Sequence, residues 1–179
     1  MPPSWNDLLL QKLSLPPKGD QGRPRVCLVG VGSDLRGDDS AGIWLARALL
    51  QDERITRMSN ILIVEGGLAP ENHTGAMRAF QPDIVLLVDA AHLDEPPGTV
   101  AWVSLDTIDG MSASSHSLPL SMLAGFLTLE LGCEVAVLAV QPGQNEFDTG
   151  LSPTVRTAVE QIKAEIGRVL LPSNPAQAL

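Results

Sequence analysis

The sequence predicts a three-layer α/β/α sandwich around a twisted sheet of about five mostly parallel strands. Short continuous apolar runs recur along the chain, as expected for strands buried on both faces of a parallel sheet. Segments with helical patterns separate most of those runs, and this alternation is typical of a layered α/β fold. With 179 residues, of which 44% are hydrophobic, the chain is long enough to bury one core of this kind.

The strands are predicted from the apolar runs themselves. Four runs predict parallel strands, at residues 25–31, 61–64, 84–88 and 135–140. A weaker run, residues 100–103, follows a Pro-Pro-Gly turn too closely for a crossover helix to precede it. We therefore expect this run to form an antiparallel strand at one edge of the sheet.

The helices are predicted between the strands. Residues 41–50 follow the first strand, roughly 70–79 follow the second, and 118–131 precede the last. The final helix has the clearest start, with Ser152 as N-cap and Pro153 at the first helical position. Its apolar residues recur every three or four positions, as on one helix face, at Val155, Val159, Ile162, Ile166 and Val169.

One domain is predicted, spanning residues 25–171. Residues 1–24 are predicted to be an N-terminal extension, in which a short amphipathic stretch precedes a Pro- and Gly-rich linker. Residues 172–179 are rich in Pro and Ala and predict a frayed C-terminal tail.

Charge and composition exclude several classes of protein. Lys and Arg number 12 and Asp and Glu 21, and the net charge of −9 argues against nucleic acid or anionic membranes as partners. No stretch reaches the ~18 apolar residues of a membrane span, and the first residues lack a signal-peptide pattern. Two distant cysteines, Cys27 and Cys133, fit a reduced cytosolic protein. We therefore expect a cytoplasmic protein, and we expect it to be a monomer.

Acidic residues gather where the predicted parallel strands end. Asp38 and Asp39 follow the first strand, Glu65 ends the second, and Asp89 ends the third. Ligand sites of open parallel sheets form at the carboxyl ends of the strands, so we expect the chemistry at this edge. If the first and third strands are neighbours, Asp39 and Asp89 face one crevice. Two facing carboxylates need a cation, a shared proton or water between them.

A dinucleotide-binding module is one alternative interpretation. Gly30 and Gly32 follow a strand as in the Gly-x-Gly-x-x-Gly fingerprint, and Glu65 stands where a ribose-binding acid would. Against it, Leu35 stands where the third glycine should be. The two adjacent aspartates would also occupy the helix start that a pyrophosphate needs.

A metal site would need an imidazole beside the carboxylates. His73 lies away from the strand ends, whereas His92 follows Asp89 by three residues and His116 precedes an apolar helix among serines. Spacing alone barely separates His92 from His116. A simpler interpretation is that an acid at a helix start is only a cap, but that does not explain Asp89.

Taken together, these residues resemble the HycI-type hydrogenase maturation endopeptidases, which trim the large subunit of NiFe-hydrogenases. The resemblance covers about residues 25–170. One residue departs from the pattern of the family, because Ser33 stands where an Asn usually follows the glycine at position 32. The resemblance rests on five motifs in the same order, at residues 37–42, 65–72, 87–90, 115–120 and 140–142.

The resemblance implies both a function and a set of site residues. The metal ligands of the family correspond to Asp39, Asp89 and His116. The implied activity is that of an endopeptidase that recognises nickel in the precursor of a NiFe-hydrogenase large subunit and removes its C-terminal extension. The nickel is expected to come with the substrate, and other divalent metals can occupy the site in the isolated protein.

Motifs that are absent narrow the mechanism. The sequence has no His-Glu-x-x-His helix and no Gly-x-Ser-x-Gly elbow, and neither cysteine has a catalytic setting. Carboxylate-assisted attack of water remains, as in an aspartyl-type endopeptidase, with Asp38 and Asp39 as the catalytic candidates. Asp38 could instead be a cap. The other functions left open are a dinucleotide-binding oxidoreductase module and a non-catalytic metal-binding maturation chaperone.

Overall fold

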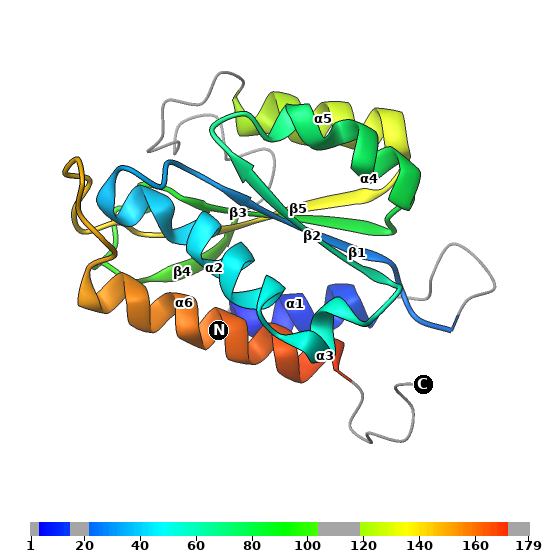
Figure 1. Cartoon of the computed structure of the whole chain (residues 1–179), viewed down its shortest axis with the longest axis horizontal. Helices are drawn as coiled ribbons and strands as arrows, with labels where there is room; N and C mark the ends of the chain where they lie inside the picture. Colours follow the sequence, from blue (N-terminus) through cyan, green and yellow to red (C-terminus); the bar gives the residue numbers. More distant parts are fainter. Residues whose placement is uncertain (1–3, 15–21, 104–118, 172–179) are drawn as a thin grey trace.

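Five strands form one sheet, and the computed structural model describes them within residues 4–14, 22–103 and 119–171 (Figure 1). The strands are β1 (Val26–Val31), β2 (Ile61–Gly67), β3 (Ile84–Ala90), β4 (Val100–Val103) and β5 (Glu134–Val140). Their order in the sheet is β2-β1-β3-β5-β4. All neighbours are parallel except β4, which pairs antiparallel with β5 at the edge. The predicted sheet and its antiparallel edge strand are confirmed.

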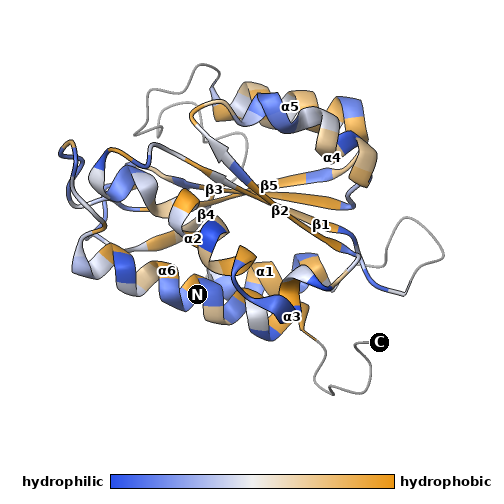
Figure 2. Cartoon of the chain, in the orientation of Figure 1, coloured by the Kyte–Doolittle hydropathy of each residue, from blue (hydrophilic) through white to orange (hydrophobic). Residues whose placement is uncertain are grey.

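Helices cover both faces of this sheet and complete the predicted three-layer sandwich (Figure 1). On one face lie α4 (Thr74–Phe80) and α5 (Leu120–Leu131). On the other lie α1 (Trp5–Leu13), α2 (Ala41–Leu50), α3 (Glu53–Thr56) and α6 (Pro153–Leu170). The buried residues accordingly form two clusters, one on each face. The strands are apolar, whereas α6 alternates apolar and polar residues, as a helix with one buried face does (Figure 2).

The observed helices differ from the predicted ones mainly at their ends. The helix predicted at roughly 70–79 begins as a 3-10 turn, η2 (Pro70–His73), before α4. A second 3-10 turn, η1 (Gly37–Ser40), precedes α2. The sequence did not predict α3, which at four residues is too short for helical periodicity to be visible. Ser152 occupies the N-cap position of α6 before Pro153, as predicted, although its side chain makes no capping hydrogen bond to this helix.

The N-terminal helix α1 belongs to the packed core. Leu9 is fully buried and Leu13 nearly so, and both join the cluster formed with α2 and α6. Lys12 forms an ion pair with Glu134 at the start of β5. Burying one leucine side chain contributes about 1.5–3 kcal/mol, so α1 is a structural part of the fold. The predicted linker and C-terminal tail fall largely on residues outside the described ranges.

The connections of β1 and β3 position the functional edge of the sheet. From β1 the chain crosses through α2 to β2 on one side, and it then returns through α4 to β3 on the other side of β1. The carboxyl ends of β1 and β3 therefore mark the point where strand order reverses, which is where ligands bind in open parallel sheets.

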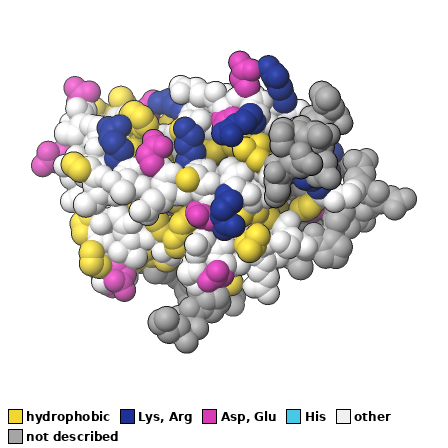
Figure 3. Space-filling view, turned by 90° about the horizontal axis from the view of Figure 1, so that it is seen from below, with side chains coloured by type: hydrophobic (Ala, Val, Ile, Leu, Met, Phe, Trp, Pro, Cys, Tyr) yellow, Lys and Arg dark blue, Asp and Glu magenta, His cyan; other side chains and the backbone are white. Residues whose placement is uncertain are grey.

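The outer surface of the α6 layer carries charges of both signs. Viewed from below in Figure 3, Lys and Arg side chains lie among Asp and Glu side chains. Ion pairs of this layer include Arg168 with Glu165 and Arg54 with Asp52. Mixed charge of this kind is typical of a solvated helix surface. Among the described residues, no helix is long and apolar enough to cross a membrane.

Candidate functional site

Two glycines bring η1 over the carboxyl edge of the sheet. A Cβ at Gly42 would lie 2.1 Å from the carbonyl oxygen of Val88 and 2.5 Å from that of Val31. Because glycine has no Cβ, the first turn of α2 rests directly on the ends of β1 and β3. Gly32 has a φ of +126°, and a Cβ there would lie 1.8 Å from the carbonyl oxygen of Asp39. The turn that carries Asp39 therefore closes against the end of β1.

The structure places Asp39 and Asp89 on neighbouring elements at this edge. Asp89 is fully buried near the end of β3, and Asp39 is 4% exposed in η1, which contacts β3. The backbone N–H of Ser33 donates to Oδ2 of Asp39 across 3.0 Å and orients this carboxylate. The expectation that the first and third strands are adjacent and parallel is confirmed. That the two carboxylates share one ligand stays a prediction.

Asp38 is also buried, but its surroundings differ from those of Asp39. Its Oδ2 accepts hydrogen bonds from the backbone N–H groups of Gly143 and Gln144, at 2.8 and 2.9 Å. The hydroxyl of Ser152 donates to the same oxygen at 2.8 Å, and the N–H of Ser152 donates to Oδ1 at 2.6 Å. Asp38 is not the helix cap that the sequence allowed, because Arg36 and Ser40 occupy the N-cap positions of η1 and α2. Its buried carboxylate is satisfied instead by four donors in residues 143–152. Its catalytic role stays a prediction.

Residues 141–152, here called the β5 exit segment, also contact the residues that follow Asp89. Oε1 of Gln141 accepts a hydrogen bond from the N–H of Leu93 at 2.6 Å. The carbonyl oxygen of Val140, the last residue of β5, accepts one from the N–H of Ala91 at 3.0 Å. The end of β5 and the β5 exit segment are therefore bonded to the loop after β3 as well as to η1.

Glu65 forms an ion pair with Arg47 that the sequence pattern did not predict. Nε of Arg47 lies 2.8 Å from Oε2 of Glu65, and its Nη2 lies 3.2 Å from Oδ2 of Asp34. The hydrogen bond to Glu65 is the main cause of the raised pKa of Arg47. The one sequence feature that could have indicated this ion pair is that Arg47 is the only charged residue of α2. Two features argue against a dinucleotide site. Glu65 is paired with Arg47, and two buried aspartates occupy the helix start that a pyrophosphate would need.

A groove of about 500 Å³ lies beside this ion pair. Its lining comes from α2, through Trp44 and Arg47, and from the two loops that contribute Asp34 and residues 148–150. Neither Asp39 nor Asp89 lines it. The groove therefore flanks the candidate site and does not contain it.

The structure places two of the three histidines. His92 is exposed in the loop after β3, and His73 is half-buried at the end of η2. His116, the predicted third ligand, lies outside the described residues. Within the described ranges, no three His, Cys, Asp or Glu side chains come together as a complete metal site. The triad of Asp39, Asp89 and His116 stays a prediction.

The sequence of the chain matches a known protein family and its members. The HycI family, described as hydrogenase maturation protease, matches residues 45–168. The chain is 32% identical to the hydrogenase 3 maturation protease of Escherichia coli K12 over 136 residues, which cover 75% of this chain and 84% of that protein.

Solved structures agree with this relationship. The crystal structure of the NiFe-hydrogenase maturation protease HycI from Thermococcus kodakarensis superposes with a TM-score of 0.78 at 29% identity, covering 91% of this chain and 98% of that one. The solution structure of the endopeptidase HycI from Escherichia coli gives a TM-score of 0.68 at 31% identity, with coverages of 78% and 86%. The sheet, its buried aspartates and these relatives lead to one conclusion: the chain belongs to the HycI family of hydrogenase maturation proteases and is a hydrolase.

Proposed function

We propose that this protease removes a C-terminal extension from the precursor of a NiFe-hydrogenase large subunit that already carries nickel. The observation that carries the proposal is the placement of two buried aspartates, Asp39 and Asp89, at the strand-order reversal of a HycI-family fold. This edge is where an open parallel sheet binds ligands. The nickel is part of the substrate.

The donor set suits a metal that arrives with a partner protein. Asp39 and Asp89 supply two carboxylates, and His116 would add an imidazole. Two carboxylates and one imidazole hold a divalent transition metal and leave further coordination positions open. Those positions are available to ligands from the precursor. A precursor without nickel would bring no cation to the two carboxylates, and an electrostatic mismatch of this kind costs several kcal/mol.

Hydrolysis adds water across one peptide bond of the precursor. A carboxylate near the bound nickel can accept a proton from the attacking water, and nickel can polarise the peptide carbonyl or position the chain. Asp39 lies at the edge where the nickel would dock, so it is one candidate for this carboxylate. Asp38 is the other candidate from the sequence. Trimming the extension would then be a single hydrolytic step in a cytoplasmic protein.

The test is cleavage of a matched pair of precursors. Chelator-treated protease is incubated with nickel-loaded and with nickel-free precursor, and the large subunit is weighed by mass spectrometry. We expect shortening of the loaded form alone. A loaded precursor that is bound but never shortened would indicate a metal-binding chaperone. Trimming of the nickel-free precursor, or a requirement for added zinc, would favour a conventional metalloprotease.

A pair of histidine variants tests the proposed ligand set. His116→Ala is expected to abolish cleavage with the fold retained. His92→Ala is the matched control, because His92 is exposed in the neighbouring loop, and it is expected to cleave normally. Loss of cleavage in the His92 variant alone would show that the third ligand is misassigned.

A further inference from the structure

Asp38 connects segments that are more than one hundred residues apart in the chain. Its carboxylate accepts four hydrogen bonds from Gly143, Gln144 and Ser152, all within 2.6–2.9 Å. The connection is reciprocal, because the N–H of Asp38 donates to the carbonyl oxygen of Gln144 at 2.8 Å. The adjacent Gly37 allows this close approach, since a Cβ there would lie 2.7 Å from the same carbonyl oxygen. The β5 exit segment is therefore fastened to η1 at Asp38.

The same segment is bonded to the loop that connects β3 to β4. Oε1 of Gln141 accepts the N–H of Leu93, and the N–H of Gln141 donates to the carbonyl oxygen of Thr99 at 2.8 Å. Because β5 pairs with β3 as far as Val140 and Ala90, the segment leaves the sheet beside the strand that carries Asp89. A residue that fastens η1 to this segment also fixes Asp39 relative to Asp89.

We propose that Asp38 is a positioning residue that holds Asp39 in the geometry needed to recognise the metal of the substrate. This inference rests on the proposed function, because it names the residue that supports the recognition site. Both oxygens of the Asp38 carboxylate point at donors of the β5 exit segment and of the start of α6. Because both oxygens are engaged by these four donors, the carboxylate is not placed to take a proton from a water molecule that attacks the substrate. Its effect on cleavage passes through Asp39.

The variant Asp38→Asn separates positioning from the other two roles. The amide keeps the shape of the carboxylate but turns an NH₂ group toward N–H donors, so at least one bond to the β5 exit segment is lost. Loss of a residue that orients a metal ligand typically weakens metal recognition 10- to 100-fold. Because recognition is a binding step, we expect the KM for the nickel-loaded precursor to rise about tenfold or more. An unstable protein, or one lacking an assisting carboxylate, would show a lower kcat with KM unchanged.

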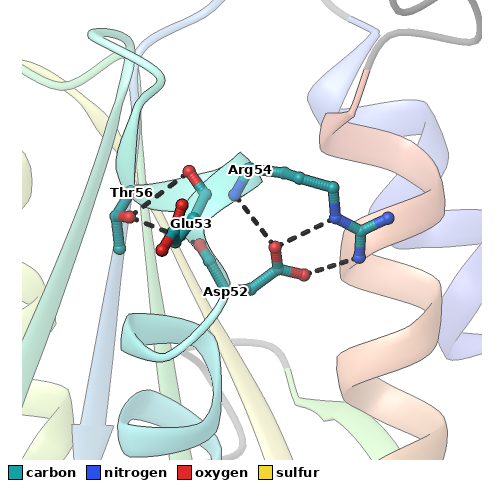
Figure 4. A network of polar contacts seen from close by, with 4 residues as sticks. All are labelled: Asp52, Glu53, Arg54 and Thr56. Atoms are coloured by element: carbon teal, nitrogen blue, oxygen red, sulfur yellow. Dashed lines mark hydrogen bonds and ion pairs between the residues drawn. The ribbon is translucent and has the colours of Figure 1, made fainter.

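Asp52→Asn is the matched control. Asp52 is the N-cap of α3, and its carboxylate accepts hydrogen bonds from the backbone N–H, Nε and Nη2 of Arg54 at 3.0, 3.0 and 2.7 Å (Figure 4). It lies at the start of α3, which precedes the amino end of β2, whereas the candidate site lies at the carboxyl ends of β1 and β3. We expect its variant to keep the KM and kcat of the wild-type protein.

The experiment measures KM and kcat with nickel-loaded precursor, and it maps hydrogen–deuterium exchange in peptides covering residues 33–40 and 143–152. The proposal expects a raised KM with faster exchange in both peptides for Asp38→Asn only. A KM within twofold of wild type overturns it, whatever happens to kcat. If Asp38→Asn does not fold, Ser152→Ala replaces it, since that change removes one of the four bonds; a KM rise of about threefold is expected and an unchanged KM overturns the proposal.

Failure of the proposed function gives a different result. In that case the wild-type protein does not shorten the nickel-loaded precursor. Hydrogen–deuterium exchange then tests only whether Asp38 positions η1. Unchanged exchange at residues 33–40 in Asp38→Asn shows that Asp38 does not position η1, whereas faster exchange there shows that it does and that only the proposed substrate is wrong.

Discussion

Replacing Gly42 by alanine tests how α2 is seated on the sheet. The added Cβ would lie 2.1 Å from the carbonyl oxygen of Val88 and 2.5 Å from that of Val31. Both obstacles are backbone atoms of central strands, so neither can rotate away, and α2 would have to move by about 1 Å or more to restore normal contacts. Overpacked cores typically lose 1–3 kcal/mol, and we expect a loss of about 3 kcal/mol here because both obstructing atoms are fixed. For a chain of this length, that lowers the melting temperature by about 6–12 °C.

Gly125→Ala is the matched control, because it makes the same change inside another helix. A Cβ at Gly125 in α5 meets nothing within 4 Å. Alanine is about 1 kcal/mol better than glycine in a helix, so this variant should be slightly more stable than wild type. Urea unfolding and thermal melting of the two variants should therefore give changes of opposite sign. Equal stabilisation by both substitutions would refute the close seating of α2.

Three further predictions concern stability and reactivity. Leu9→Ala should cost about 2–5 kcal/mol in urea unfolding, whereas Leu10→Ala, at a 42% exposed position, should cost much less; equal effects would show that α1 does not pack on the core. Burial, followed by the nearby Cys133, raises the pKa of Cys27 to about 12, so the folded protein at pH 8 should resist thiol labelling until it is unfolded. The hydrogen bond from Arg54 is the largest cause of the lowered pKa of Asp52. The stabilisation from this hydrogen bond is therefore complete above the pKa that Asp52 has in the unfolded chain, and it is lost as pH falls through the lower pKa of the folded protein. The difference in unfolding free energy between wild type and Asp52→Asn should therefore shrink in acid.

Local patterns were sufficient to predict most of the fold. The continuous apolar runs predict β1, β3 and β5 because a strand buried on both faces must be apolar at every position. The short connection after Pro96-Pro97-Gly98 predicts that β4 is antiparallel, because a parallel crossover needs a longer segment. The packing of α1 on the core was not predicted. Its contacts with α6 and β5 join residues far apart in the chain, and no local periodicity shows them.

The site was predictable to the extent that it follows from strand ends. Asp89 and the turn holding Asp39 could be assigned to one edge because parallel strands present their carboxyl ends together. The ion pair of Arg47 with Glu65 could not be assigned in this way. It depends on the rotation of α2 relative to β2, which is fixed by packing at Gly42 and not by the spacing of these residues in the sequence.

Asp38 and Asp39 show most clearly what only the tertiary structure determines. In the sequence they are adjacent aspartates at the start of one helix, and either could be a cap or a catalytic acid. In the fold, the Asp38 carboxylate meets donors that lie 105 to 114 residues later in the chain, while the Asp39 carboxylate meets the N–H of Ser33 only six residues earlier. The β5 exit segment therefore distinguishes the two residues. Because a 3-10 turn rotates successive side chains by about a third of a turn, fixing one of them to this segment sets the direction of the other. This arrangement supports the two proposed roles, in which Asp38 maintains the geometry and Asp39 meets the substrate.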